Sequence, residues 1–99
     1  MLSIIIPFCN EKANISRTTS CILEVMNKSK ISCELIFVND GSKDRTHELI
    51  EQETQKHDNV RGICFSRNFG KEPCMFAGLR ASRGDCCVVM DCDLQHPPR

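Results

Sequence analysis

Features that would assign this 99-residue chain to several protein classes are missing. Thirteen basic side chains balance thirteen acidic ones, so no net charge draws the chain to nucleic acid or to an anionic membrane surface. The longest apolar stretches, at residues 4–6 and 86–90, are far shorter than the roughly 18 residues of a membrane-spanning helix. We therefore expect no membrane crossing within these residues. Any phosphate that the chain binds must be held by local groups.

Common motifs of nucleotide sites and of hydrolases are also absent. The five glycines never form the GxGxxG pattern of dinucleotide-binding enzymes, which weakens a dehydrogenase as an interpretation. Gly70-Lys71 lacks the spacing and the serine or threonine of a P-loop. No serine or cysteine lies in a nucleophile elbow.

Eight cysteines are present, and in a short secreted chain they would suggest a disulfide scaffold. Their placement argues against secretion. No CxxC pair occurs, Cys64, Cys86 and Cys87 lie in apolar runs typical of strands, and residues 1–3 lack the basic start of a signal peptide. We expect reduced, mostly buried thiols that act as small hydrophobic side chains in a cytoplasmic protein.

Apolar runs alternate with polar stretches that are long enough for helices. Strands are predicted over residues 2–8, 34–38, 60–66 and 86–90, and the first is predicted to be buried on both faces. Ile15, Ile22, Val25 and Met26 recur at helical spacing, so we predict a first helix that ends near Lys28.

Two further helices are predicted between the later strands. Ser42 can cap the second helix, which Leu49 and Ile50 would anchor. The third helix carries Pro73 in its first turn, and Gly84 is expected just past its end. Its predicted apolar side consists of Met75, Phe76 and Leu79.

This order predicts one α/β domain over residues 1–99, with a Rossmann-like βαβαβαβ fold of four mainly parallel strands and helices on both faces. In such sheets, ligands bind beyond the carboxyl ends of the strands, near the point where strand order reverses. Each predicted strand is followed by a polar cluster. The clusters are Asn10-Glu11, Asp40-Gly41-Ser42, Arg67-Asn68 and Asp91-Cys92-Asp93.

Two of these clusters predict specific contacts. Asp91 and Asp93 are two residues apart, which in an extended segment directs both carboxylates to one side, where they can share Mg²⁺ or Mn²⁺. A solvated turn is the alternative. The Asp40 carboxylate can accept hydrogen bonds from a base or a ribose, or Asp40-Gly41-Ser42 can be a helix-capping turn.

Three segments together resemble the ordered signature of family 2 glycosyltransferases with the GT-A fold, and the match covers nearly the whole chain. They are residues 5–11 (IIPFCNE), 37–44 (FVNDGSKD) and 89–95 (VMDCDLQ). Residues 66–72 (SRNFGKE) and 94–98 (LQHPP) further resemble the branch that moves sugars onto polyprenyl phosphate, which includes dolichyl-phosphate mannose synthases and bacterial undecaprenyl-phosphate glycosyltransferases. Enzymes of that branch act in cell-envelope or glycolipid biosynthesis.

The resemblance implies that residues 1–99 form the nucleotide-sugar-binding, N-terminal part of a GT-A domain. It implies a DxD motif in which Asp91, Asp93 and Gln95 hold Mg²⁺ or Mn²⁺, with Asp93 as the catalytic residue. It also implies a nucleotide pocket for a UDP- or GDP-sugar. The residues of that pocket would be Pro7, Phe8, Cys9, Glu11, Val38, Asp40, Asp91 and Cys92.

The chain departs from the family pattern at two positions. Cys9 stands where an aromatic residue usually precedes Asn-Glu, so base stacking there is lost or reassigned. Arg99 stands where an acidic residue commonly follows the two prolines. In the family, the residues that close over the acceptor and the donor sugar, and any membrane-associated helices, lie beyond this point. We therefore expect the acceptor half to be missing.

Three functions follow as hypotheses. In the first, the complete enzyme moves a sugar from a nucleoside diphosphate to a lipid phosphate. It would act in the cytoplasm or at the cytoplasmic face of a membrane, and it would bind no nucleic acid. Its oligomeric state is left open. In the second, the chain is a non-catalytic nucleotide- and metal-binding fragment. The third, a phosphoacceptor signalling domain, needs an acidic pair after the first strand, and Asn10-Glu11 fits it poorly.

Overall fold

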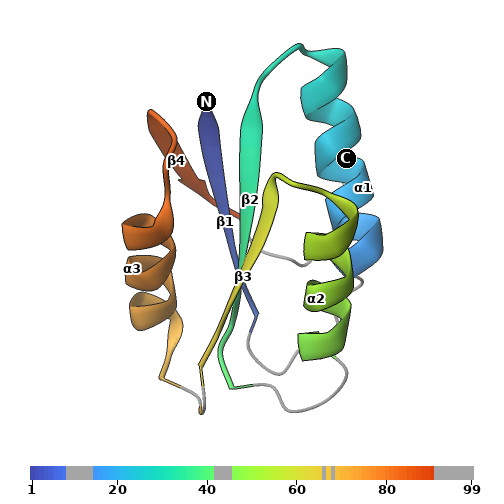
Figure 1. Ribbon diagram of the computed structural model, residues 1–99. Helices are drawn as coiled ribbons and strands as arrows, with labels where there is room; N and C mark the ends of the chain where they lie inside the picture. Colours follow the sequence, from blue (N-terminus) through green and yellow to red (C-terminus); the bar gives the residue numbers. More distant parts are fainter. Residues whose placement is uncertain (9–14, 42–45, 66, 68, 91–99) are drawn as a thin grey trace, which may run out of the picture.

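The computed structural model describes residues 1–8, 15–41, 46–65, 67 and 69–90 (Figure 1). Strands and helices alternate as the sequence predicted, and the fold is an α/β sandwich of three layers. The elements are β1 (Leu2–Phe8), α1 (Ile15–Lys28), β2 (Cys33–Asn39), α2 (Thr46–Lys56), β3 (Val60–Cys64), α3 (Lys71–Ala81) and β4 (Cys86–Val89). The predicted Ser42 cap of α2 lies outside the described residues.

The four strands form one sheet in the order β3-β2-β1-β4, and every pair is parallel. The chain moves outward from β1 to β2 and β3, then returns to place β4 on the other side of β1. Strand order therefore reverses between β1 and β4. In parallel sheets this is the position where the loops after two neighbouring strands part and leave room for a ligand.

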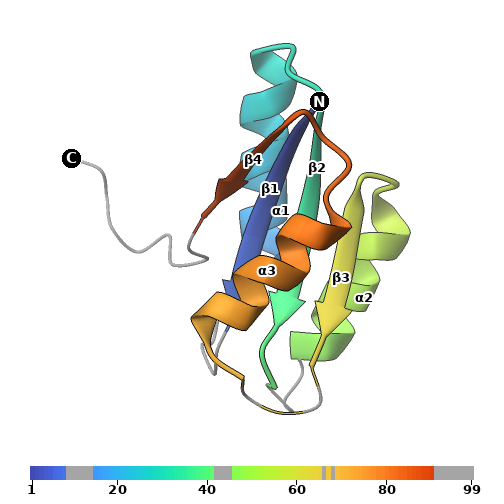
Figure 2. The same ribbon diagram turned by 90° about the vertical axis from the view of Figure 1, so that its left-hand side faces the viewer.

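The helices cover both faces of the sheet, as predicted. Figure 1 shows α1 and α2 on one face and α3 on the other, and Figure 2 looks onto the face that α3 covers. In β1, Ile4 and Ile6 pack into the core beneath α1 and α2, whereas Ile5 packs beneath α3. All three are at most 1% exposed, and burial of each contributes about 1.5–3 kcal/mol.

The predicted apolar side of α3 is wrong at Phe76 and Leu79, whereas the third predicted residue, Met75, is partly buried. Phe76 is 66% exposed and Leu79 is 41% exposed, whereas Cys74 is completely buried. Gly78, one turn after Cys74, lies so close to β1 that an added Cβ would be 2.4 Å from Ile5 Cγ2. The helix thus packs through its smallest side chains, because close approach to the sheet leaves no room for the large ones.

The predicted burial of the thiols is wrong for most of the described cysteines. Cys33 and Cys74 are buried, but Cys21, Cys64, Cys86 and Cys87 are exposed. The two in β4 are exposed because β4 is an edge strand and the described helices pack on the other three strands. On α1, Val25 is likewise 54% exposed, although its spacing placed it on the apolar side.

A buried polar network joins the amino ends of the strands. The Glu34 carboxylate accepts hydrogen bonds from Ser3 Oγ at 2.6 Å, from the Arg83 N–H at 2.6 Å and from Arg61 Nη2 at 2.9 Å. Burial alone would raise the pKa of Glu34, but these hydrogen bonds and the Arg61 charge outweigh it and lower the pKa. The network holds the loop between α3 and β4 against the sheet.

Gly84 belongs to the same loop, two residues beyond the Ser82 that ends α3. Its N–H donates to Ser3 Oγ at 2.9 Å. An added Cβ would lie 2.5 Å from the Met1 carbonyl oxygen and 3.0 Å from the Ser3 nitrogen. Glycine is therefore needed here for close approach to β1, and not for the helix-ending role that the sequence predicted.

Candidate functional site

The carboxyl ends of the four parallel strands lie at one edge of the sheet, as the sequence predicted. The register aligns Pro7 with Val38, and Asn39 with Cys64. At the end of β4, the Met90 N–H donates to the Ile5 carbonyl oxygen at 2.9 Å. The chain therefore leaves β4 beside β1, at the point where strand order reverses. We refer to these strand ends as the carboxyl edge.

Asp40 follows β2 at this edge, and only 1% of it is exposed. Its two carboxylate oxygens accept hydrogen bonds from the N–H of Phe69 at 2.7 Å and from the N–H of Gly70 at 3.0 Å. Gly41 and Gly70 have positive φ angles of 83° and 104°, which glycine adopts without strain and which let the backbone turn on both sides of the carboxylate.

These bonds give Asp40 a role that the sequence did not predict, because Asp40 fixes the residue that immediately precedes α3. A carboxylate has about four acceptor positions, and the two backbone N–H groups use two of them. Because only 1% of Asp40 is exposed, the described bonds tie the end of β2 to the start of α3 within the folded chain. The predicted contact with a base or a ribose stays a prediction.

The other predicted pocket residues divide into two groups. Pro7 is partly buried near the end of β1, where Phe8 is the last strand residue. The Val38 side chain is completely buried beneath α3, so it can shape a pocket only through the residues packed around it. The remaining predicted residues lie outside the described residues. They are Cys9, Glu11, Asp91, Cys92, Asp93 and Gln95.

An aromatic and cationic group follows β3, and sequence reasoning missed its packing. The rings of Phe65 and Phe69 meet edge to face with centroids 5.3 Å apart. The Arg67 guanidinium carbon lies 5.0 Å from the Phe69 centroid, within the range of a cation–π contact. The alternation of Phe65, Arg67 and Phe69 is visible in the sequence, but a pattern of period two does not show which rings touch.

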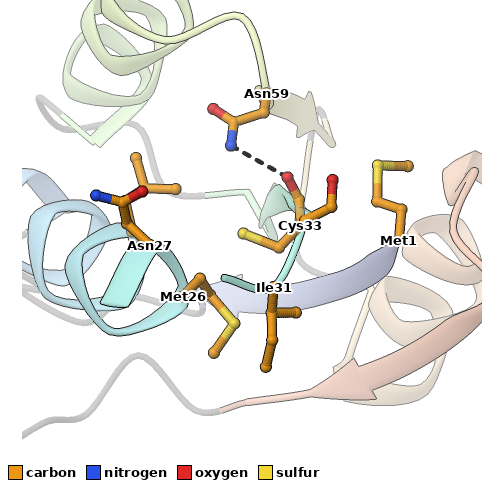
Figure 3. Close-up of a pocket in the computed structure, with 8 residues that line it drawn as sticks. Met1, Met26, Asn27, Ile31, Cys33 and Asn59 are labelled. Carbon is orange, nitrogen blue, oxygen red and sulfur yellow. Dashed lines mark hydrogen bonds between the residues drawn. The ribbon is translucent and has the colours of Figure 1, made fainter. Parts of the chain in front are cut away.

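A cavity of about 450 Å³ opens at the opposite, amino end of the sheet (Figure 3). Met1, Met26 and Ile31 contribute apolar side chains to it, and the Asn59 amide donates to the Cys33 carbonyl oxygen at 3.1 Å in its wall. This cavity is remote from the strand ends where the predicted ligand groups lie. It contributes nothing to the candidate site.

The described residues contain neither a metal cluster nor a membrane-spanning helix. Within residues 1–8, 15–41, 46–65, 67 and 69–90, no three His, Cys, Asp or Glu side chains gather closely enough to hold a metal ion. The predicted ligands Asp91, Asp93 and Gln95 are not in these ranges. No helix within the same ranges is long and apolar enough to cross a membrane.

Comparison with known proteins assigns the family. The sequence model described as "Glycosyl transferase family 2" matches residues 3–99. The chain belongs to glycosyl transferase family 2. An uncharacterized glycosyltransferase of Bacillus subtilis, YkcC, is 44% identical over 96 residues, which are 97% of this chain and 30% of the relative. The bactoprenol glucosyl transferase of Shigella phage SfV is 38% identical over 96 residues, 97% of this chain and 31% of that protein.

Solved structures agree on the fold of this family 2 chain. The mannosyltransferase PcManGT from Pyrobaculum calidifontis, in complex with GDP-Man and Mn²⁺, gives a TM-score of 0.71 at 20% identity over 93% of this chain and 27% of its own. Residues 1–349 of TarS from S. aureus, in complex with UDP-GlcNAc, give a TM-score of 0.69 at 23% identity. The match covers 93% of this chain and 26% of the TarS chain. The chain thus has the fold of the N-terminal part of a GT-A glycosyltransferase and spans about 30% of the length of its curated relatives.

Proposed function

We propose that the protein to which this chain belongs transfers a sugar from a nucleoside diphosphate sugar to a polyprenyl phosphate, and that residues 1–99 are its donor-binding part. The observation that carries the proposal is the position of β4. Asp91-Cys92-Asp93 follows Met90 directly in the sequence, and the Met90 N–H is bonded to β1 where strand order reverses. That is the position at which open α/β sheets bind ligands.

The proposed donor site combines two sets of residues. Asp91, Asp93 and Gln95 carry the hard oxygen donors that Mg²⁺ and Mn²⁺ prefer, and such ions usually complete their shell with water and substrate phosphates. When bound, the cation would neutralise charge on the departing diphosphate, and Asp93 is the proposed catalytic residue. The nucleoside would lie beside the second set, in which Val38 acts only through the residues packed around it. This set consists of Pro7, Phe8, Cys9, Glu11, Val38, Asp40, Asp91 and Cys92.

In this proposal Asp40 has two tasks. Its bonds to the N–H groups of Phe69 and Gly70 hold the start of α3 at the carboxyl edge. We propose that an acceptor position left over by these bonds takes a donor group of the base or the ribose. The complexes of the structural neighbours with GDP-Man and with UDP-GlcNAc support a nucleoside diphosphate sugar as the donor, without choosing the base.

The acceptor is proposed from the relatives named bactoprenol glucosyl transferases. A phosphate oxygen of the lipid would attack the sugar carbon while the bond from that carbon to the nucleoside diphosphate breaks. Because a phosphate is already ionised at neutral pH, this transfer depends less on a general base than transfer to a hydroxyl does. The proposed site of action is the cytoplasmic face of a membrane.

The test is transfer of labelled sugar to polyprenyl phosphate by the longer protein. We expect the double variant Asp91→Ala, Asp93→Ala to lose about 10²–10³-fold or more in turnover, the scale seen when one charge-stabilising group is removed from an active site. Asp85→Ala is the matched control, because Asp85 precedes the same strand at its other end and its side chain is 89% exposed. The substitution removes the ion pair with the N-terminal amino group, and such an exposed pair contributes little to stability. Full activity of the double variant would overturn the proposal.

A second candidate is that these 99 residues bind a nucleotide and a metal ion but catalyse nothing alone, which their span of about 30% of the relatives favours. Calorimetry with UDP and with GDP, each with and without Mn²⁺, measures binding by the chain. We expect binding that depends on the cation and no sugar transfer. Turnover by the chain alone would refute this candidate.

A further inference from the structure

A cysteine, a histidine and a glutamate form a line of contacts beside the carboxyl edge. Cys64 is the last residue of β3, and its Sγ lies 2.9 Å from His47 Nδ1. On the other side of the imidazole, His47 Nε2 lies 3.6 Å from Glu51 Oε2. His47 and Glu51 are one turn apart on α2, so both can face one residue of the neighbouring strand.

The packing of α2 on β3 produces this contact. Ile50 of α2 is buried over Gly62 of β3, and an added Cβ on Gly62 would lie 2.5 Å from Ile50 Cγ2. The missing side chain lets the helix approach the strand closely enough for His47 to reach Cys64. In β2, Asn39 is the register partner of Cys64, and its side chain forms a hydrogen bond with the thiol.

The surroundings keep Cys64 protonated at rest. Partial burial raises the pKa of the Cys64 thiol, the hydrogen bond with Asn39 opposes this, and the negative charge of Glu51 raises the pKa further. The net effect raises the pKa of Cys64, so the sulfur is a thiol and not a thiolate at neutral pH. It becomes nucleophilic only when its proton moves to an acceptor, and His47 Nδ1 is within hydrogen-bond reach.

Glu51 is placed to assist that transfer. A carboxylate near Nε2 favours the histidine tautomer whose proton is on Nε2, which leaves the Nδ1 lone pair toward the sulfur. It also stabilises the imidazolium that forms when Nδ1 takes the thiol proton. The order of groups, with a nucleophile, a base and a group that orients the base, is the arrangement that activates cysteine nucleophiles in general.

We propose that Cys64 is a site of mixed-disulfide formation with low-molecular-weight disulfides such as glutathione disulfide, with His47 as the proton acceptor. The Cys64 proton moves to His47 Nδ1 as the sulfur attacks one sulfur of the disulfide. A new sulfur–sulfur bond forms, the original one breaks, and the departing thiolate takes the proton from His47. Cys64 is oxidised, and half of the disulfide is reduced to a free thiol.

Such a modification would act on the carboxyl edge. The Phe65 N–H, directly after Cys64, donates to the Asn39 carbonyl oxygen at 2.9 Å, and Asp40 follows Asn39. A tripeptide attached to Cys64 would therefore stand beside the strand end from which Asp40 holds the start of α3. This inference goes beyond the proposed sugar transfer and does not depend on it.

The chain supplies its own reference thiols. Cys21 on α1 and Cys86 in β4 are also exposed, and no described histidine is bonded to either. Because exchange rates rise with the thiolate fraction, the raised pKa alone would make Cys64 slower than a thiol of ordinary pKa. Assistance by His47 would make it faster, so the ranking of the rates distinguishes the two cases.

The experiment is exposure of the reduced chain to glutathione disulfide at neutral pH, followed by quenching and peptide-resolved mass spectrometry. We expect Cys64 to react at least about tenfold faster than Cys21 and Cys86, since general-base assistance contributes about 10²–10⁴-fold in favourable sites. His47→Gln should remove this advantage and leave the rates at Cys21 and Cys86 unchanged. In urea the three cysteines should react alike.

A second variant separates loss of the base from loss of folding. Glu51→Gln keeps the histidine and the helix. It removes the group that orients His47 but also a charge that raises the pKa of Cys64, so it should lower the Cys64 rate by less than His47→Gln does. Circular dichroism checks that both variants remain folded. A Cys64 rate no greater than that of Cys21, or a rate that neither substitution lowers in folded protein, would overturn the proposal whether or not the chain binds a nucleotide.

Discussion

Replacing Glu34 with glutamine should destabilise the fold through one identifiable conflict. Glu34 Oε2 accepts from Ser3 Oγ and from the Arg83 N–H, and Oε1 accepts from Arg61. Glutamine has nearly the same shape but only one acceptor oxygen, so its NH₂ group must face Arg61 or the Arg83 N–H. At least one hydrogen bond to a charged group is lost in a buried site, which costs about 1.5–3 kcal/mol.

The effect should depend on pH with a definite sign. The pKa of Glu34 is lowered below its ordinary value of 4.5 in the folded chain. The ionised carboxylate therefore contributes stability that is fully present above that ordinary value and is lost as the pH falls through the lowered, folded value. In acid the wild-type side chain becomes neutral like glutamine, so the difference between the two proteins should shrink.

Urea denaturation followed by circular dichroism measures both effects. We expect Glu34→Gln to lower the free energy of unfolding by about 1.5–3 kcal/mol at neutral pH, with the gap narrowing as the pH falls below 4.5. Glu24→Gln, on the exposed side of α1, is the control and should stay within about 0.5 kcal/mol. An unchanged free energy at neutral pH, or a gap that does not narrow in acid, would refute this reasoning.

Three further substitutions test the fold and the carboxyl edge. Asp40→Asn should cost about 1–3 kcal/mol and speed amide exchange at Phe69 and Gly70, because one of the two N–H groups loses its acceptor; unchanged exchange would contradict this role. Gly78→Val should lower the free energy of unfolding in urea by about 1–3 kcal/mol, because its Cβ would meet Ile5 at 2.4 Å. Phe76→Ser changes a side chain that is 66% exposed, so the free energy of unfolding should change by less than about 0.5 kcal/mol. A large decrease in that free energy would show that α3 packs through Phe76.

The alternation of elements was predictable because local composition determines it. The run from Leu2 to Phe8 matches β1 residue for residue, since a strand buried on both faces needs continuous β-branched and apolar side chains. The carboxyl edge was predictable for the same reason, because strands that alternate with helices are parallel and end together. The prediction for β3 ran two residues too far, because Phe65 extends the apolar run beyond Cys64.

Burial was harder to predict, because it depends on which strand lies at the edge. Cys86 and Val89 have the composition of a buried strand, yet both are exposed at the side of the sheet. The packing side of α3 was missed for a related reason. We expected large apolar side chains to form the contact surface, whereas α3 packs on the sheet through small residues, namely Cys74, Gly78 and Ala81.

Contacts between side chains distant in sequence could not be predicted at all. Asp40 bonds residues 29 and 30 positions away, and the contact between His47 and Cys64 spans 17 positions. No sequence spacing indicates either set of contacts, because both depend on how the helices pack on the sheet. Glu34 gave no sequence signal either, although it is the centre of the buried polar network.

The pairing of β4 with β1 has a consequence for the order in which the chain folds. Leu2 pairs with Cys86, so this pairing joins the two ends of the described chain, whereas β1 with β2 and β2 with β3 close much shorter loops. Longer loops cost more entropy to close, and non-local pairings form late. During synthesis, β1 to β3 can therefore assemble with α1 and α2 while β4 is still in the ribosome. The side of β1 that completes the proposed ligand site would be the last to be formed.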